Sequence, residues 1–314
     1  MNIAITGANG FIGNNLFNFF IKNNINAIKL SREKNSNGKF TNNFFFGTKN
    51  NHKLENIDTV IHCAARVHKF RENKYIAEDL YKESNVFCTK KLAEEAIKKG
   101  VKKFIFLSSI KVNGEKTTES HLFNEKSKEN PQDIYAKTKL EAEKVLLSLQ
   151  ENNQLKVIII RPPLVYGPGV GANFRSMMWA INKEIPLPFK KNKNKRSFIF
   201  IDNLIAFIYE CCINDSFKNQ IFTISDNNDL STSELIKKIN FYMKKDGKQF
   251  CINKKVIKLF LKLFNKEKTY DKLFNSLQID PIESFKAMNF IPPYSVDYGI
   301  KKTVSWYLKN HNKF

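Results

Sequence analysis

A glycine triplet near the start of the chain constrains the fold more than any other feature. The apolar run Asn2 to Thr6 leads directly into TGANGFIG, and an apolar pattern of helical period follows from Phe11 to Phe20. A strand, a glycine-rich turn and a helix in this order bring backbone N–H groups to a pyrophosphate at the helix N-terminus. The triplet predicts dinucleotide binding, with an ordinary glycine-rich turn as the alternative. The predicted contacts are Gly7, Gly10, Phe11, Ile12 and Gly13.

Strand-like and helical segments then alternate over the first half of the chain. The predicted strands are 26–30, 59–63, 103–107 and 156–160, and the predicted helices are 81–99 and 134–149. Alternation of this kind predicts an α/β fold, a Rossmann-like doubly wound parallel sheet with helices on both faces.

The pattern loosens after Pro162, which indicates a second, smaller part of the chain. One further strand-like run, 198–201, leads into a helix from Asn203, and smaller helical pieces follow. We expect a dinucleotide-binding domain over 1–165, to which 197–225 returns. We expect residues 166–196 and 226–314 to form a smaller, interleaved C-terminal substrate lobe.

Composition excludes several classes of protein. The formal charge is +22, which indicates either a polyanionic partner or AT-rich coding, since 46 of the 52 basic residues are lysines. The basic run at 190–196 lacks the interleaved aromatic residues of a nucleic-acid site, so no nucleic-acid partner is expected. Five cysteines without C-x-x-C spacing favour a reduced, cytoplasmic chain without a metal site. No apolar run is long enough to span a membrane.

The end of the second predicted strand bears on the choice between NAD and NADP. NAD-binding proteins usually place a carboxylate on the ribose 2′-hydroxyl about 20 residues beyond the glycines. This chain has Ser31 and Arg32 there, and an arginine suits a 2′-phosphate. Glu33 follows and would serve NAD if the turn shifted by one residue. NADP(H) is therefore the preferred cofactor, and NAD(H) remains possible.

A candidate catalytic set begins at the end of the predicted strand 103–107. Tyr135 and Lys139 form Y-x-x-x-K on one face of a predicted helix, and Ser108 and Ser109 end a strand 26 residues earlier. A neighbouring ammonium and a positive nicotinamide are expected to lower the pKa of Tyr135 from about 10, so that it exchanges a proton near neutral pH. The alternative is a chance match on a lysine-rich helix.

These motifs together resemble the extended short-chain dehydrogenase/reductase family, in its NAD-dependent epimerase/dehydratase branch. The spacing G-x-x-G-x-x-G is that family's, and the resemblance covers nearly the whole chain. It is carried by DTVIHCAARVH (58–68), FIFLSSIKVNGE (104–115), RPPLVYGPGVGANF (161–174), RSFIFIDNL (196–204) and FIPPYSVDYGIKKTVSWY (290–307). The set is similar to bacterial UDP-sugar C4 enzymes of surface-polysaccharide pathways.

The resemblance implies a role for each site residue. Ser109 binds the reacting oxygen, Tyr135 is the acid/base, and Lys139 holds the nicotinamide ribose. Further cofactor contacts are implied for Ala64, Ala65, Asn85 and Pro162, and substrate contacts for Ser109, Lys111, Asn173 and Arg196. Arg66 and His68 either face the nicotinamide or are structural. The family's second phosphate-binding arginine has no match after Arg196.

We therefore expect an NADP(H)-dependent oxidoreductase acting at C4 of a UDP-hexose, a UDP-4-keto-6-deoxy-N-acetylhexosamine 4-reductase. The alternative is a UDP-glucose or UDP-N-acetylglucosamine 4-epimerase with retained NAD. A 4,6-dehydratase is disfavoured because Ile110 and Lys111, rather than a carboxylate, follow Ser109. A non-catalytic, NADP-sensing or RNA-binding protein is disfavoured by the complete Ser–Tyr–Lys set. The resemblance also implies a homodimer formed through the Asn85 and Tyr135 helices. The amphipathic stretch Lys254 to Phe264 is expected to pack on the core, with an interfacial membrane helix as the alternative.

Overall fold

The chain divides into two compact units. The computed structural model describes residues 1–30, 54–67, 74–118, 120–215, 221–252, 257, 270 and 273–311. The first unit contains Met1–Asn113, Lys128–Arg161 and Phe207–Phe222, and the second contains Gly114–Ser127, Pro162–Ala206 and Thr223–Phe314. The chain therefore passes between the units several times.

This division is more finely interleaved than the ranges expected from the sequence. Residues 114–127 belong to the second unit because their backbone pairs with that of 276–280. Thr117 N donates to Ser276 O at 2.9 Å, and Phe123 N donates to Gln278 O at 3.0 Å. These pairings join residues more than 150 positions apart, which no local sequence pattern indicates.

A six-stranded sheet is the centre of the first unit. Its strand order is β2-β1-β3-β4-β5-β8, and β1 to β5 pair in parallel. The strands are β1 (Asn2–Thr6), β2 (Asn26–Leu30), β3 (Thr59–His62), β4 (Lys103–Leu107), β5 (Lys156–Arg161) and β8 (Ile221–Thr223). The parallel sheet confirms the predicted α/β class.

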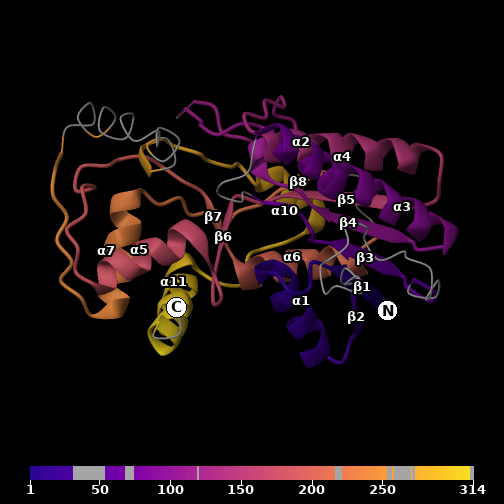
Figure 1. Cartoon of the computed structure of the whole chain (residues 1–314). Coiled ribbons are helices and arrows are strands. Elements are labelled where there is room, and N and C mark those ends of the chain that lie inside the picture. The colour runs from indigo at the N-terminus through magenta and orange to yellow at the C-terminus, as the bar shows by residue number, and fades with distance from the viewer. Residues whose placement is uncertain are drawn as a thin grey trace. The chain divides into compact units, whose positions relative to one another are not determined.

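Helices cover both faces of this sheet, with α3 (Cys88–Lys98) and α4 (Ile134–Glu151) on one side and α1 (Phe11–Lys22) on the other (Figure 1). Strands β3 and β4 are buried at every position, as expected where helices lie over both faces. Val60, Phe104 and Ile159 form part of the buried core on the α3 and α4 side. The later part of α6 (Ile201–Ile213) adds Tyr209, whose ring lies 5.7 Å from that of Phe19 on α1.

The helix predicted from Tyr81 begins earlier and is not uniform. It starts as α2 (Lys74–Lys82), passes through a π-helical turn, η1 (Glu83–Phe87), and continues as α3. The π-helical turn contains Asn85, one of the predicted site residues. Short π-helical segments inside α-helices occur frequently at functional sites.

The second unit combines a small parallel sheet with helices. Strand β6 (Leu164–Tyr166) pairs with β7 (Phe198–Phe200), and the helices include α5 (Ala172–Asn182), α7 (Thr232–Met243), α10 (Ile282–Met288) and α11 (Val296–Asn310). Helix α7 packs against α5 and α11. Buried Tyr166 donates to Asp226 at 2.8 Å and links the small sheet to the segment after β8.

Candidate active site

The carboxyl ends of β1 and β3 meet where the strand order reverses. Nucleotides bind at this position in open α/β sheets. Gly7 follows β1 with a φ of 67°, and a Cβ there would lie 2.8 Å from the backbone nitrogen of Ala64, which follows β3. Glycine at this position is therefore required both by the conformation and by the approach of the two chain segments.

The N-terminus of α1 fits a bound pyrophosphate. Gly10 caps the helix without a side-chain hydrogen bond, and the first turn contains no acidic residue. A Cβ on Gly13 would lie 2.8 Å from the carbonyl carbon of Gly7, so helix and turn are packed backbone against backbone. The N–H groups of Phe11, Ile12 and Gly13 belong to the first helical turn, where N–H groups have no partner within the helix. The predicted glycine loop thus has the geometry of a phosphate cradle.

Asn85 holds the segment after β3 in place. Its Oδ1 accepts from Arg66 N at 2.7 Å, and its Nδ2 donates to Arg66 O at 3.2 Å and to Thr138 Oγ1 on α4 at 3.0 Å. The buried Asn85 amide thus joins Arg66, two residues beyond Ala64, to the helix that carries Tyr135. These contacts are those of a positioning residue, and direct binding of cofactor by Asn85, Ala64 or Ala65 stays a prediction.

A buried histidine lies beneath this segment. His62 at the end of β3 is hydrogen-bonded to Thr6 Oγ1 at 2.6 Å and to Thr89 Oγ1 at 2.9 Å. Burial, with a smaller contribution from the charge of Lys139, lowers the pKa of His62 to about 3. His62 is therefore a neutral connector between β1, β3 and α3, a role that no pattern in the sequence indicates.

Lys139 joins α4 to the end of β4. Its Nζ donates to the carbonyl of Leu107, the last residue of β4, at 2.6 Å, and lies 4.3 Å from the centre of the Phe106 ring. Ser109 lies two residues beyond Leu107, and its Oγ accepts from Lys111 N at 3.3 Å. The predicted serine therefore follows the same strand end that the predicted lysine contacts.

The pKa of Tyr135 differs from the sequence-based expectation. Burial raises this pKa, and the neighbouring Asp133 and Tyr81 raise it further. Burial also lowers the pKa of Lys139 to about 8, although Cys63 and Glu143 oppose this change. The protein alone therefore does not lower the pKa of Tyr135, because desolvation and the charge of Asp133 both disfavour the phenolate.

The residues directly after Ser109 are an apolar side chain and a cation. Ile110 is buried, and Lys111 Nζ forms an ion pair with Asp133 at 2.6 Å. Asp133 also caps α4, because its Oδ1 accepts from Ala136 N at 2.8 Å. Lys111 therefore ties the Ser109 turn to the start of the helix that carries Tyr135.

The other predicted substrate residues lie in the second unit. Arg196 Nη1 donates to Asn275 O at 3.0 Å, and the Arg196 backbone pairs with Leu230. Burial lowers the pKa of Arg196 to about 10. Asn173 is exposed in the first turn of α5, and buried Pro162 directly follows β5. Binding of substrate by Arg196 and Asn173, and of cofactor by Pro162, stays a prediction.

Several predicted features lie outside the described residues, namely Ser31, Arg32, Glu33, His68 and all of 254–264 except Ile257. Among the residues that the structure describes, no group of three histidine, cysteine, aspartate or glutamate side chains could hold a metal ion. No helix in the same part of the chain has the length and apolar character needed to cross a membrane.

Comparison with known proteins gives concordant similarities. The model of the NAD dependent epimerase/dehydratase family matches residues 3–224. A UDP-glucose 4-epimerase of Vibrio cholerae is 37% identical over 321 residues, covering 99% of this chain and 97% of that protein. A dTDP-D-glucose 4,6-dehydratase of Mus musculus is 27% identical, covering 83% of this chain and 70% of that protein. The solved structure of UDP-glucuronic acid 4-epimerase from Bacillus cereus in complex with NAD shares the fold, with a TM-score of 0.76 at 20% identity over 98% of this chain and 99% of that one.

Proposed function

This chain belongs to the NAD-dependent epimerase/dehydratase family of extended short-chain dehydrogenases/reductases, and on that premise we propose that it is a UDP-hexose 4-epimerase that retains NAD. The similarity to a UDP-glucose 4-epimerase, which extends over 99% of the chain, supports this choice. This choice ranks the epimerase above the reductase, which is the opposite of the ranking that Ser31 and Arg32 suggested.

One contact supports the catalytic set that this proposal uses. The hydrogen bond of 2.6 Å from Lys139 Nζ to Leu107 O joins the Y-x-x-x-K helix to the strand end that Ser109 follows. A tyrosine, a lysine and a serine held to one sheet edge are the groups that proton exchange with a sugar hydroxyl requires.

The chemistry assigned to these residues is proton transfer at the oxygen on C4. The Ser109 hydroxyl hydrogen-bonds this oxygen, and Tyr135 accepts its proton as the 4-keto sugar forms and returns the proton on reduction. Bound NAD supplies the hydride acceptor and a positive charge that favours the tyrosine phenolate. Lys139 binds the nicotinamide ribose, and its ammonium favours the same phenolate.

A reductase is the second candidate, and Arg32 is the observation that favours it. A UDP-4-keto-6-deoxy-hexosamine 4-reductase would use the same Ser109, Tyr135 and Lys139 but would exchange NADPH with the pool. An arginine at the ribose of the adenosine would select the 2′-phosphate of that cofactor. A 4,6-dehydratase is a weaker candidate because buried Ile110 and the paired Lys111 supply no acid beside Ser109.

We assign the nucleotide part of the substrate to the second unit. Arg196 is the proposed ligand of the UDP diphosphate, because a guanidinium binds two phosphate oxygens at once. Asn173 is the proposed second contact.

We also propose that the protein is a homodimer, with α3 and α4 as the paired helices. Sedimentation of the purified protein tests this proposal.

The purified protein distinguishes the two candidates. Mass spectrometry of the protein as isolated should find retained NAD, and UDP-glucose and UDP-galactose should interconvert without added reductant. Arg32→Ala should leave this activity unchanged, and Glu33→Ala should weaken NAD retention.

The opposite pattern would establish the reductase. The protein would then be free of cofactor and would consume NADPH stoichiometrically with a UDP-4-keto sugar. Arg32→Ala would remove a charge-assisted contact of about 1.5–3 kcal/mol and weaken NADPH binding roughly 10- to 150-fold. NADH binding would be almost unaffected, because its ribose carries no phosphate.

A further inference from the structure

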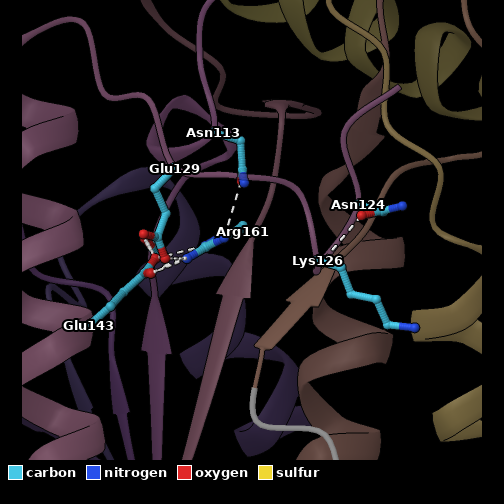
Figure 2. A network of polar contacts seen from close by, with 7 residues as sticks. Asn113, Asn124, Lys126, Glu129, Glu143 and Arg161 are labelled. Carbon is cyan, nitrogen blue, oxygen red and sulfur yellow. Dashed lines mark hydrogen bonds and ion pairs between the residues drawn. The ribbon is translucent and has the colours of Figure 1, made fainter. Parts of the chain in front are cut away.

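A buried ion pair lies one helical turn beyond Lys139. Glu143 on α4 and Arg161 at the end of β5 are each 1% exposed, and Arg161 Nη2 donates to Glu143 Oε2 at 2.5 Å. Arg161 Nε also contacts both carboxylate oxygens, at 3.1 and 3.2 Å (Figure 2). Tyr135, Lys139 and Glu143 follow one another at intervals of four, so all three occupy one face of α4.

The network extends to the strand end that precedes Ser109. Ser108 Oγ donates a short hydrogen bond to Glu143 Oε1. Arg161 Nη1 donates to Asn113 Oδ1, in the turn beyond Ser109, at 3.3 Å. The Glu143 carboxylate is thus bound at once to residues at the carboxyl ends of β4 and β5.

Stability alone is a poor reason for such a pair. Burying two charges costs free energy that their attraction only partly offsets, and apolar replacements of buried ion pairs are often neutral or stabilising. An exchange of the pair for apolar groups would retain the packing but would lose the fixed directions of its hydrogen bonds. The network therefore has its clearest use in fixing the position of α4 relative to the two strand ends.

We propose that Glu143 is a positioning residue for the C4 chemistry: through Ser108 and Arg161 it fixes the Tyr135–Lys139 face of α4 against the strand ends that flank Ser109. This inference rests on the proposed function. Glu143 has a second, electrostatic effect, because its negative charge favours the ammonium form of Lys139, which burial opposes. The other titratable groups that act on Lys139 come from the end of β3, where Cys63 favours the ammonium and His62 is itself affected by the lysine charge.

Glu143→Gln is the primary test, because glutamine keeps the size of the side chain and removes the charge. We expect kcat to fall by about tenfold or more, since small displacements of reacting groups cost up to about 100-fold, while KM changes little. We also expect the loss of activity on the alkaline side to move to lower pH, because Lys139 then loses its proton more readily. A fall in melting temperature with unchanged kcat and an unchanged pH profile would overturn the proposal.

Glu129→Gln is the matched control. Glu129 Oε1 lies 3.6 Å from the same Arg161 Nη2, but the side chain is 40% exposed. This variant should keep both kcat and the pH profile. If its losses equalled those of Glu143→Gln, removal of any negative charge beside Arg161 would explain the effect, and the proposal would be overturned. Ser108→Ala serves if Glu143→Gln does not fold: it should lower kcat without moving the pH profile, and unchanged kcat would overturn the proposal.

Binding of NAD without sugar separates this inference from the proposed function. Calorimetric titrations of the protein with NAD, after removal of the NAD that it retains, should show affinity falling as Lys139 deprotonates. The fall should occur at lower pH in Glu143→Gln. If the wild-type protein turns over no UDP-hexose but this shift is present, the proposed function fails while the effect of Glu143 on Lys139 stands. If turnover is present but neither the shift nor the kcat loss occurs, the inference fails alone.

Discussion

At the scale of single residues, Tyr135 carries the most direct test of the site. Tyr135→Phe keeps the ring and removes the group that exchanges a proton. Turnover should fall by about two to four orders of magnitude, the usual contribution of general acid–base catalysis, while NAD binding measured by calorimetry persists. Tyr81→Phe, which changes a buried tyrosine nearby, should keep most of the activity. Turnover near that of the wild type in Tyr135→Phe would remove Tyr135 from the mechanism.

His62 makes the stability of the protein sensitive to acid. Its pKa is lowered to about 3, so between its ordinary value of 6.5 and that value only the unfolded chain binds the proton. The free energy of unfolding should therefore fall as pH decreases below 6.5, by up to about 1.4 kcal/mol per pH unit from this group. Urea unfolding followed by circular dichroism should show a shallower pH dependence for His62→Gln. His121→Gln changes an exposed histidine and should match the wild type. If the free energy of unfolding changed equally with pH in all three proteins, His62 would not be the source of the acid sensitivity.

The candidate catalytic residues could be proposed from the sequence, but the residues that support them could not. Ser109, Tyr135 and Lys139 are recognisable because their spacing recurs in a family. Glu143 was visible only as a helix residue four positions after Lys139, and Arg161 only as one of six arginines. Their partnership joins positions 18 apart through burial, which a linear pattern does not contain.

At the scale of elements, the start of α1 is the part most restricted by packing. A Cβ on Gly13 would lie 2.8 Å from the Gly7 carbonyl carbon and 2.9 Å from Ala8 Cα, and both are backbone atoms that cannot easily move. Gly13→Ala should cost about 1–3 kcal/mol of stability, as overpacking usually does, and weaken NAD binding by about tenfold or more. Calorimetry and thermal unfolding measure the two effects. Gly171→Ala, where a Cβ meets nothing within 4 Å, should change NAD affinity little, and a similar loss in both variants would contradict the packing argument.

The elements that the sequence predicted well are those with strong apolar periodicity. The strands 103–107 and 156–160 and the helix from Ile134 agree with the structure within one or two residues. The π-helical turn at Glu83–Phe87 was missed because its residues have the same apolar spacing as an α-helix. The equally short β7 was predicted because it lies in the apolar run 198–201, whereas β6 and β8 were missed because neither stands out from its surroundings by alternation.

At the scale of the whole molecule, each unit alternates with the other along the chain, so neither corresponds to one continuous segment. Predicting a Rossmann-like part and a second lobe required only the change of pattern after Pro162. Assigning 114–127 required its pairing with 276–280, which depends on tertiary structure. The two proposed ligands fall on different units, since the glycine loop belongs to the first and Arg196 to the second.

This assignment predicts that the two ligands bind through separable sets of residues. Arg196→Lys keeps the charge but loses the planar fork, so UDP affinity should weaken by about tenfold, or about 1.4 kcal/mol, while NAD affinity stays the same. Hydrogen exchange should agree: UDP should slow exchange of the Arg196 amide, which donates to Leu230 O at 3.0 Å, in the wild type and less in the variant. NAD should slow exchange at the start of α1 equally in both proteins.

Lys193→Gln is the control for Arg196→Lys. It removes an exposed charge from the basic run 190–196 and should retain UDP affinity near that of the wild type at moderate salt. Equal losses of UDP and NAD affinity in Arg196→Lys would show instead that Arg196 supports the fold, through the bond of 3.0 Å that it donates to Asn275 O.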